Sequence, residues 1–142
     1  MSSYLSIYLQ KKKKEGEEQG ERLLLCSISR ANELYNLFYE NRVGKAVEDN
    51  LYEFTCKDVS SLVIDIDEAI ARVMANVYEM KENLSYISNK ESIREILDDI
   101  SADKECIREL LNQKAEVEAI SFLFEDVGTD YCPFDKLYWC IE

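Results

Sequence analysis

Two long stretches of heptad-like apolar spacing constrain the fold of this chain more than any other feature. In the first stretch, apolar residues recur every three or four positions, at Leu62, Ile66, Ala69, Val73, Val77, Met80, Leu84 and Ile87. This spacing is typical of an amphipathic helix with one apolar seam, here about seven turns long. Such a helix needs a second element to cover its seam.

The second stretch supplies that element. Its apolar positions are Ile93, Ile96, Ile100, Ile107, Leu110, Val117, Ile120 and Phe124. Asp103 and Lys114 interrupt it where the heptad favours apolar groups. The polar segment 88–92 separates the two seams, and a short polar loop between two long helices favours an antiparallel helical hairpin. Gly128 is expected at the C′ position of the second helix, and Pro133 marks a turn beyond it.

The segments on either side of the hairpin predict a small sheet. "YLSIYL" (4–9) and "RLLLCSI" (22–28) read as strands, and a polar, glycine-containing tip between them favours a β-hairpin. "NELYNLFYEN" (32–41) predicts a short helix, whose start Ser29 or Asn32 could cap. "NLYEFTCKD" (50–58) and "DKLYWCIE" (135–142) predict two further strands.

We therefore expect an α+β fold: a small antiparallel sheet, built from the N-terminal hairpin and the C-terminal strand, with one short helix and a long antiparallel two-helix hairpin. The length of 142 residues suits a single domain, 1–142. In this domain, residues 3–57 and 134–142 form the sheet and the short helix, and residues 58–127 form the helical hairpin. Two helices alone leave apolar flanks exposed, which predicts a homo-oligomer, either a dimer or a larger assembly.

The charge balance limits the classes of partner. The chain has 29 acidic and 17 basic residues, a formal net charge of −12, which disfavours direct binding to nucleic acid or to anionic membranes. No apolar run is long enough to span a membrane. In the N-terminal segment the charges follow the apolar run, unlike in a signal peptide. These features predict a cytoplasmic protein.

The residue types argue against catalysis and against a cofactor. Histidine is absent, which removes the commonest general base and the commonest transition-metal ligand. The five cysteines form no C-x-x-C pair, and reduced thiols without an activating histidine are poor nucleophiles. No EF-hand spacing occurs. We expect no enzyme activity, no cofactor and no metal.

Acidic residues gather on the predicted hairpin, which carries 7 basic and 17 acidic residues between Asp58 and Asp126. Three interpretations remain open for these residues. They could form a solvated face or a divalent-cation site. Alternatively, they could form a negative stripe that imitates a nucleic-acid backbone and occupies the basic groove of another protein. The residues concerned are Asp65, Asp67, Glu68, Asp98, Asp99, Asp103 and Glu105.

Arg30 lies where a strand gives way to a helix. Free backbone N–H groups at a helix start favour anions, and the guanidinium fork of arginine suits phosphate. With Ser29 and Asn32, Arg30 is therefore a candidate site for a nucleotide-like ligand. In the alternative, Ser29 caps the helix and Arg30 points to solvent or pairs with Glu33. The chain lacks a glycine-rich phosphate loop.

The segments "SSYLSIYL" and "LLLCSISRANELYNLF", followed by the long helical hairpin, resemble small uncharacterised phage and prophage proteins. In those proteins a strand ends in a Ser-Arg step, and a short helix with a Tyr and a Phe follows. The resemblance implies a mobile-element accessory protein that acts by binding, in the host cytoplasm. Such a protein could block a CRISPR effector, mask another defence factor or sequester a nucleotide signal.

Three functions follow in order of preference. The first is a non-catalytic, phage-type accessory protein that inhibits or modulates a host protein, with an anti-CRISPR or other anti-defence role. The second is an oligomeric sponge that sequesters a nucleotide signalling molecule. The third is a structural oligomerisation or assembly factor.

Overall fold

A computed structural model describes residues 3–142 and shows the expected α+β architecture. Within this range the elements, in chain order, are β1 (Tyr4–Lys11), β2 (Arg22–Ser29), α1 (Glu33–Asn41), β3 (Lys45–Glu48), β4 (Leu51–Phe54), α2 (Cys56–Leu84), α3 (Lys90–Phe124) and β5 (Phe134–Ile141). The chain divides into two compact units. The first comprises Met1–Ser61 with Glu116–Glu142, and the second comprises Leu62–Ala115.

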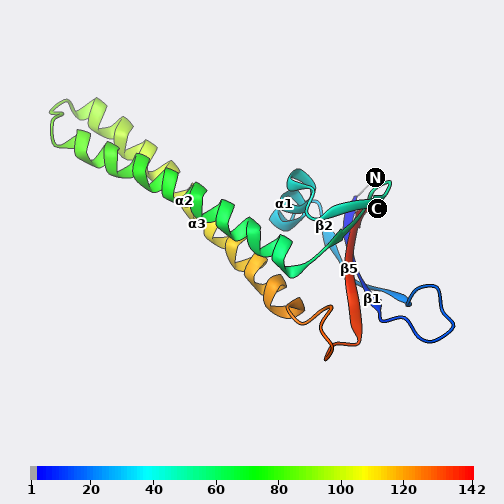
Figure 1. Cartoon of the computed structure of the whole chain (residues 1–142). Coiled ribbons are helices and arrows are strands. Elements are labelled where there is room, and N and C mark those ends of the chain that lie inside the picture. The colour runs from blue at the N-terminus through cyan, green and yellow to red at the C-terminus, as the bar shows by residue number, and fades with distance from the viewer. Residues whose placement is uncertain (1–2) are drawn as a thin grey trace. The chain divides into compact units, whose positions relative to one another are not determined.

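The first unit contains a five-stranded antiparallel sheet in the order β2-β1-β5-β4-β3. The predicted N-terminal hairpin and C-terminal strand are confirmed, and Figure 1 shows β5 beside β1. Ile7 of β1 lies opposite Cys26 of β2 and Trp139 of β5. Strand β5 is central, with β1 and β4 beside it, and these three strands supply the buried apolar side chains of the sheet.

One face of this sheet carries the core. Leu5, Ile7 and Trp139 are almost fully buried on it. Helix α1 covers them with Phe38, whose ring meets that of Trp139 edge-on at 5.8 Å. The ring of Phe54 meets Phe38 in the same way at 5.4 Å. Edge-to-face contacts of this kind stabilise aromatic pairs beyond their area burial.

Two local features differ from the sequence-based expectation. Strand β3 was not expected; it pairs with β4 across a two-residue turn, and Gly44 just before it lies too close to the Glu53 carbonyl for any side chain. The strand expected over residues 50–58 is shorter, because α2 begins at Cys56. The Thr55 hydroxyl accepts from the Asp58 N–H, and the Asp58 carboxylate accepts from the Thr55 N–H, so the two residues form a capping box.

The two long helices confirm the predicted hairpin (Figure 1). Helix α3 begins inside the polar break, where the Asn89 side chain accepts from the backbone N–H groups of Glu91 and Ser92. It ends at Phe124, so Gly128 does not take the expected C′ position. Gly128 has a positive φ of 89° in the following turn, where its N–H donates to the Phe134 carbonyl.

Candidate functional site

The second unit is a helical hairpin whose seam is incompletely covered. Every residue from 67 to 115 keeps part of its side chain in contact with solvent, including the seam residues Val73, Val77 and Ile107. Two helices cannot enclose a seam from all sides, because each helix covers only the face toward the other. Apolar surface therefore remains available on the hairpin.

The two polar residues that interrupt the second seam are both paired across the hairpin. The Asp103 carboxylate accepts from the Asn76 amide at 2.9 Å. The Lys114 ammonium lies 2.9 Å from the Asp67 carboxylate. These pairs join α3 to α2 at two points about three turns apart, and they hold the helices in one antiparallel register.

Several large apolar side chains of the hairpin are exposed. On α2, Ile64, Met74 and Tyr78 fall within roughly 80° of each other at 100° per residue. On α3, Leu97 and Leu111 fall within roughly 40° of each other. Exposed apolar groups grouped on one face are typical of protein interaction surfaces rather than of an inert solvated helix.

An apolar groove runs between the helices near the middle of the hairpin. It has a volume of about 290 Å³. Val77, Ile100 and Ile107 line it, and Lys81 of α2 and Lys104 of α3 complete its lining. We call these five residues the hairpin groove. Two ammonium groups beside an apolar surface favour an apolar group flanked by carboxylates.

The predicted acidic residues do not form one continuous stripe. Asp65 and Glu68 share a face of α2, but Asp67 lies on another face and pairs with Lys114. Asp103 is engaged in the seam. On α3, basic residues such as Arg94 and Arg108 are interleaved with the acidic ones.

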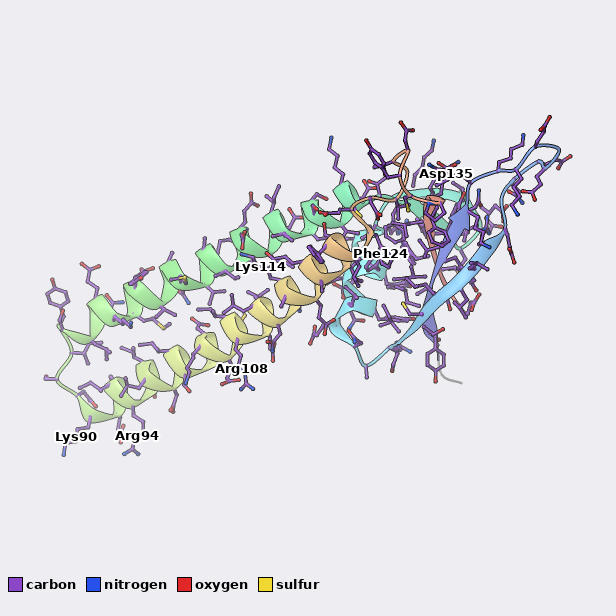
Figure 2. The ribbon with its side chains drawn as sticks, turned by 90° about the horizontal axis from the view of Figure 1, so that it is seen from below. Lys90, Arg94, Arg108, Lys114, Phe124 and Asp135 are labelled. Atoms are coloured by element: carbon purple, nitrogen blue, oxygen red, sulfur yellow. The ribbon has the colours of Figure 1, made fainter. Side chains whose placement is uncertain are left out.

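Asp98 and Glu105, seven residues apart, share the side of α3 opposite its seam, and Asp99 is displaced from them by about 100°. Figure 2 shows the basic residues Arg94 and Arg108 on the side of α3 away from α2. Arg108 lies 3.6 Å from Glu105 in an exposed ion pair. This outer side of α3 therefore carries both signs of charge. Among residues 3–142, no group of three or more acidic or cysteine side chains could hold a metal ion.

The predicted ligand site at the β2–α1 junction is largely occupied by local hydrogen bonds. Asn32 is the N-cap of α1, and its side-chain oxygen accepts from the Leu34 N–H at 2.8 Å. The Ser29 hydroxyl accepts from the Ala31 N–H at 3.3 Å. Arg30 is exposed in the turn between these two residues. The structure thus brings the three residues together, but the side-chain oxygens of Ser29 and Asn32 already accept hydrogen bonds from backbone N–H groups.

A polar network that the sequence did not predict lies on the other face of the sheet. The Glu142 carboxylate accepts hydrogen bonds from the Ser6 hydroxyl at 2.9 Å and the Tyr8 hydroxyl at 2.6 Å. The bond to Glu142, with partial burial, raises the pKa of Tyr8 to about 12. The same bonds from Tyr8 and Ser6 lower the pKa of Glu142. Burial and the neighbouring Glu142 raise the pKa of Cys140 to about 11, so its thiol is protonated at neutral pH.

Comparison of the chain with protein-family models, with curated protein sequences and with solved structures finds no match. No helix within residues 3–142 is long and apolar enough to cross a membrane.

Proposed function

We propose that this protein is a non-catalytic accessory protein of the phage type, which binds a host protein in the cytoplasm and inhibits or modulates it. An anti-CRISPR or other anti-defence role is the form of this function that the sequence resemblance favours. The observation that carries the proposal is the hairpin groove, an apolar hollow with a lysine on each helix. The same two helices also expose Met74, Tyr78, Leu97 and Leu111.

The groove indicates the chemistry of the partner surface. When an apolar side chain of the partner packs against Val77, Ile100 and Ile107, water leaves both that side chain and the groove. This burial of apolar surface supplies most of the binding free energy. Carboxylates beside it would meet Lys81 and Lys104. An amphipathic helix with an acidic flank presents both groups. We therefore assign the contact to this groove rather than to the outer side of α3, where acidic and basic groups alternate.

The test compares two charge reversals of equal size on one hairpin. The first variant carries Lys81→Glu and Lys104→Glu in the groove, and the matched control carries Lys90→Glu and Arg94→Glu, both exposed on α3. Tagged wild-type and variant proteins are used to capture partners from host lysate, with quantitative mass spectrometry. We expect the groove variant to lose the captured host protein by tenfold or more, and the control to retain it.

Capture should also weaken as the salt concentration rises from about 0.05 to about 0.5 M, because the electrostatic screening length falls severalfold over this range. Circular dichroism of each variant shows whether the helices remain folded. Equal capture by the groove variant and by wild type, with folded helices in both, would refute the assignment of the contact to the groove.

A second candidate function is self-association, in which this protein serves as an assembly factor. The incompletely covered seam over residues 67–115 favours it, because a second copy packed on the hairpin would bury the remaining apolar flanks. Sedimentation equilibrium over a hundredfold range of concentration tests it. A dimer or larger species that dissociates in a Leu97→Ser, Leu111→Ser variant supports this function, and a monomer at every concentration excludes it.

A further inference from the structure

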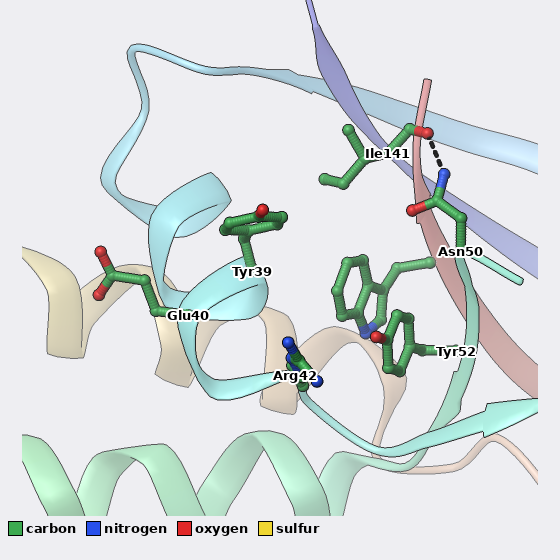
Figure 3. A pocket seen from close by; sticks show the side chains of 7 residues that line it. Tyr39, Glu40, Arg42, Asn50, Tyr52 and Ile141 are labelled. Atoms are coloured by element: carbon green, nitrogen blue, oxygen red, sulfur yellow. Dashed lines mark hydrogen bonds between the residues drawn. The ribbon is translucent and has the colours of Figure 1, made fainter.

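A second hollow, separate from the hairpin, lies in the first unit between the end of α1 and the sheet. It has a volume of about 420 Å³, within the range of small-molecule sites. Figure 3 shows Tyr39 and Arg42 on the α1 side, and Tyr52, Asn50 and Ile141 on the sheet side. We call this hollow the Arg42 cleft. Neither the β2–α1 junction nor the hairpin groove contributes to it.

Both tyrosines of the cleft rest on a buried aromatic ring. Tyr39 stacks on Tyr35, with ring centroids 6.3 Å apart, and Tyr35 is buried. Tyr52 stacks on Trp139 at 4.4 Å with the planes nearly parallel. Trp139 is itself fixed, because its indole N–H donates to the Val43 carbonyl at 2.7 Å. The two exposed tyrosine surfaces are therefore held in place before any ligand arrives, which reduces the entropy lost on binding.

The polar groups of the cleft favour a ligand that carries an anionic group beside an aromatic ring. Within residues 3–142 no hydrogen bond or ion pair engages the Arg42 guanidinium, so its planar fork of donors is available for a phosphate or carboxylate. Glu40 lines the cleft too, but in Figure 3 its carboxylate points away from the sheet side. Asn50 donates its amide N–H to the Ile141 carbonyl, which fixes the orientation of its own carbonyl oxygen.

The backbone at this cleft is unusual. Arg42 (φ 46°) and Asn50 (φ 62°) are the two non-glycine residues of range 3–142 with a positive φ, and both line the cleft. Asparagine adopts this conformation readily in turns, but arginine does not. A glycine at the C-cap of α1 would satisfy the backbone at lower cost. The presence of arginine there indicates that its side chain has a use that the fold alone does not require.

We propose that the Arg42 cleft binds a mononucleotide, with the base stacked on a tyrosine and the phosphate held by Arg42. A single nucleotide fits better than a nucleic-acid strand, because the net charge of −12 repels a polyanion. Stacking on tyrosine is tolerant of base identity, so the side-chain carbonyl of Asn50 is the group that would discriminate between bases. This inference is independent of the partner proposed for the hairpin.

The test uses the four ribonucleoside 5′-monophosphates as probes, with adenosine and inorganic phosphate as partial ligands. Trp139 is the only tryptophan, so its indole N–H gives one resonance in a ¹H–¹⁵N spectrum and reports directly on the cleft. We expect at least one mononucleotide to shift this resonance in a saturable manner. Adenosine and phosphate alone should bind at least tenfold more weakly, because each makes only part of the contacts.

Two variants locate the anion. Arg42→Gly should lower the nucleotide affinity by tenfold or more and leave adenosine binding unchanged. Arg72→Ala is the control, since it removes an exposed arginine of α2 that does not line the cleft, and it should bind as wild type does. The proposal is overturned if no mononucleotide gives a saturable shift, if adenosine binds as tightly as AMP, or if Arg72→Ala loses as much affinity as Arg42→Gly.

Discussion

Replacing Arg42 by glycine should stabilise the fold while it removes the proposed ligand contact. Arg42 is the C-cap of α1, with φ 46° and ψ 56°, and its N–H donates to the Phe38 carbonyl. A left-handed conformation costs an L-residue about 1–2 kcal/mol, and glycine avoids this cost. Glycine also gives the unfolded chain more freedom, which opposes folding by about 0.4–1 kcal/mol. The net gain in the free energy of unfolding is about 0.5–1 kcal/mol.

For a chain of this length, that gain corresponds to a rise in the thermal midpoint of about 2–3 °C. Thermal denaturation followed by circular dichroism measures it for wild type, Arg42→Gly and Arg42→Ala. Alanine removes the guanidinium but keeps the left-handed cost, so Arg42→Ala should melt within about 1 °C of wild type. A midpoint for Arg42→Gly at or below that of Arg42→Ala would show that the backbone argument is wrong. A fall of several degrees in both variants would show that the arginine side chain supports the fold instead.

Four further predictions concern other parts of the molecule. The hydrogen bond to Glu142 raises the pKa of Tyr8 from 10.0 to about 12, so its contribution to stability is present below pH 10 and is lost as the pH rises from 10 to 12. Urea titrations over this range should show a smaller loss for Tyr8→Phe than for wild type; equal losses would contradict the pKa argument. The pKa of Glu142 is lowered, so its contribution to stability is present above the ordinary carboxyl pKa and is lost as the pH falls below that value. Glu142→Gln should lack this loss of stability in acid. Trp139→Phe should lower the free energy of unfolding by about 2–3 kcal/mol, because it leaves a smaller ring and a buried carbonyl without its donor; a drop in the thermal midpoint of less than about 3 °C would argue against that role. Asp103→Leu should change stability by less than about 1 kcal/mol, since the exposed hydrogen bond to Asn76 is exchanged for apolar contact in the seam; a loss above about 2 kcal/mol in urea unfolding would show that the pair is required for the hairpin.

Periodicity predicted the hairpin and the main strands because each depends on residues close in the chain. The seam from Leu62 to Ile87 has one apolar face, and only a helix places those positions together. The start of α2 was missed by a few residues, although Thr55 and Asp58 have the spacing of a capping box. Strand β3 was missed because its four residues are all exposed and show no alternation of apolar and polar positions.

The Arg42 cleft could not be predicted in this way, because it joins the segment from α1 to β4 with β5, which is distant in sequence. Arg42 comes from the end of α1, Asn50 from the β3–β4 turn and Trp139 from β5. Only the pairing of β4 with β5 brings Tyr52 onto Trp139. The left-handed conformation of Arg42 was also hidden, because a sequence marks such positions mainly through glycine or asparagine. The Asp-Asn pair at residues 49 and 50 does indicate the β3–β4 turn, because both residue types are favoured in turns.

The hairpin groove constrains how the second unit could be covered. In a symmetric pairing of two hairpins through this groove, Lys81 and Lys104 of one copy would face the same lysines of the other. Like charges brought together at an interface are unfavourable, and the apolar area between them would have to offset that repulsion. A carboxylate-bearing surface removes the conflict. The outer side of α3 carries Asp98 and Glu105, but Arg94 and Arg108 lie on the same side, so a heterologous pairing of that side with the groove would only partly replace repulsion by attraction. An acidic amphipathic helix, as proposed for the host partner, would occupy the groove without this conflict and without requiring any assembly.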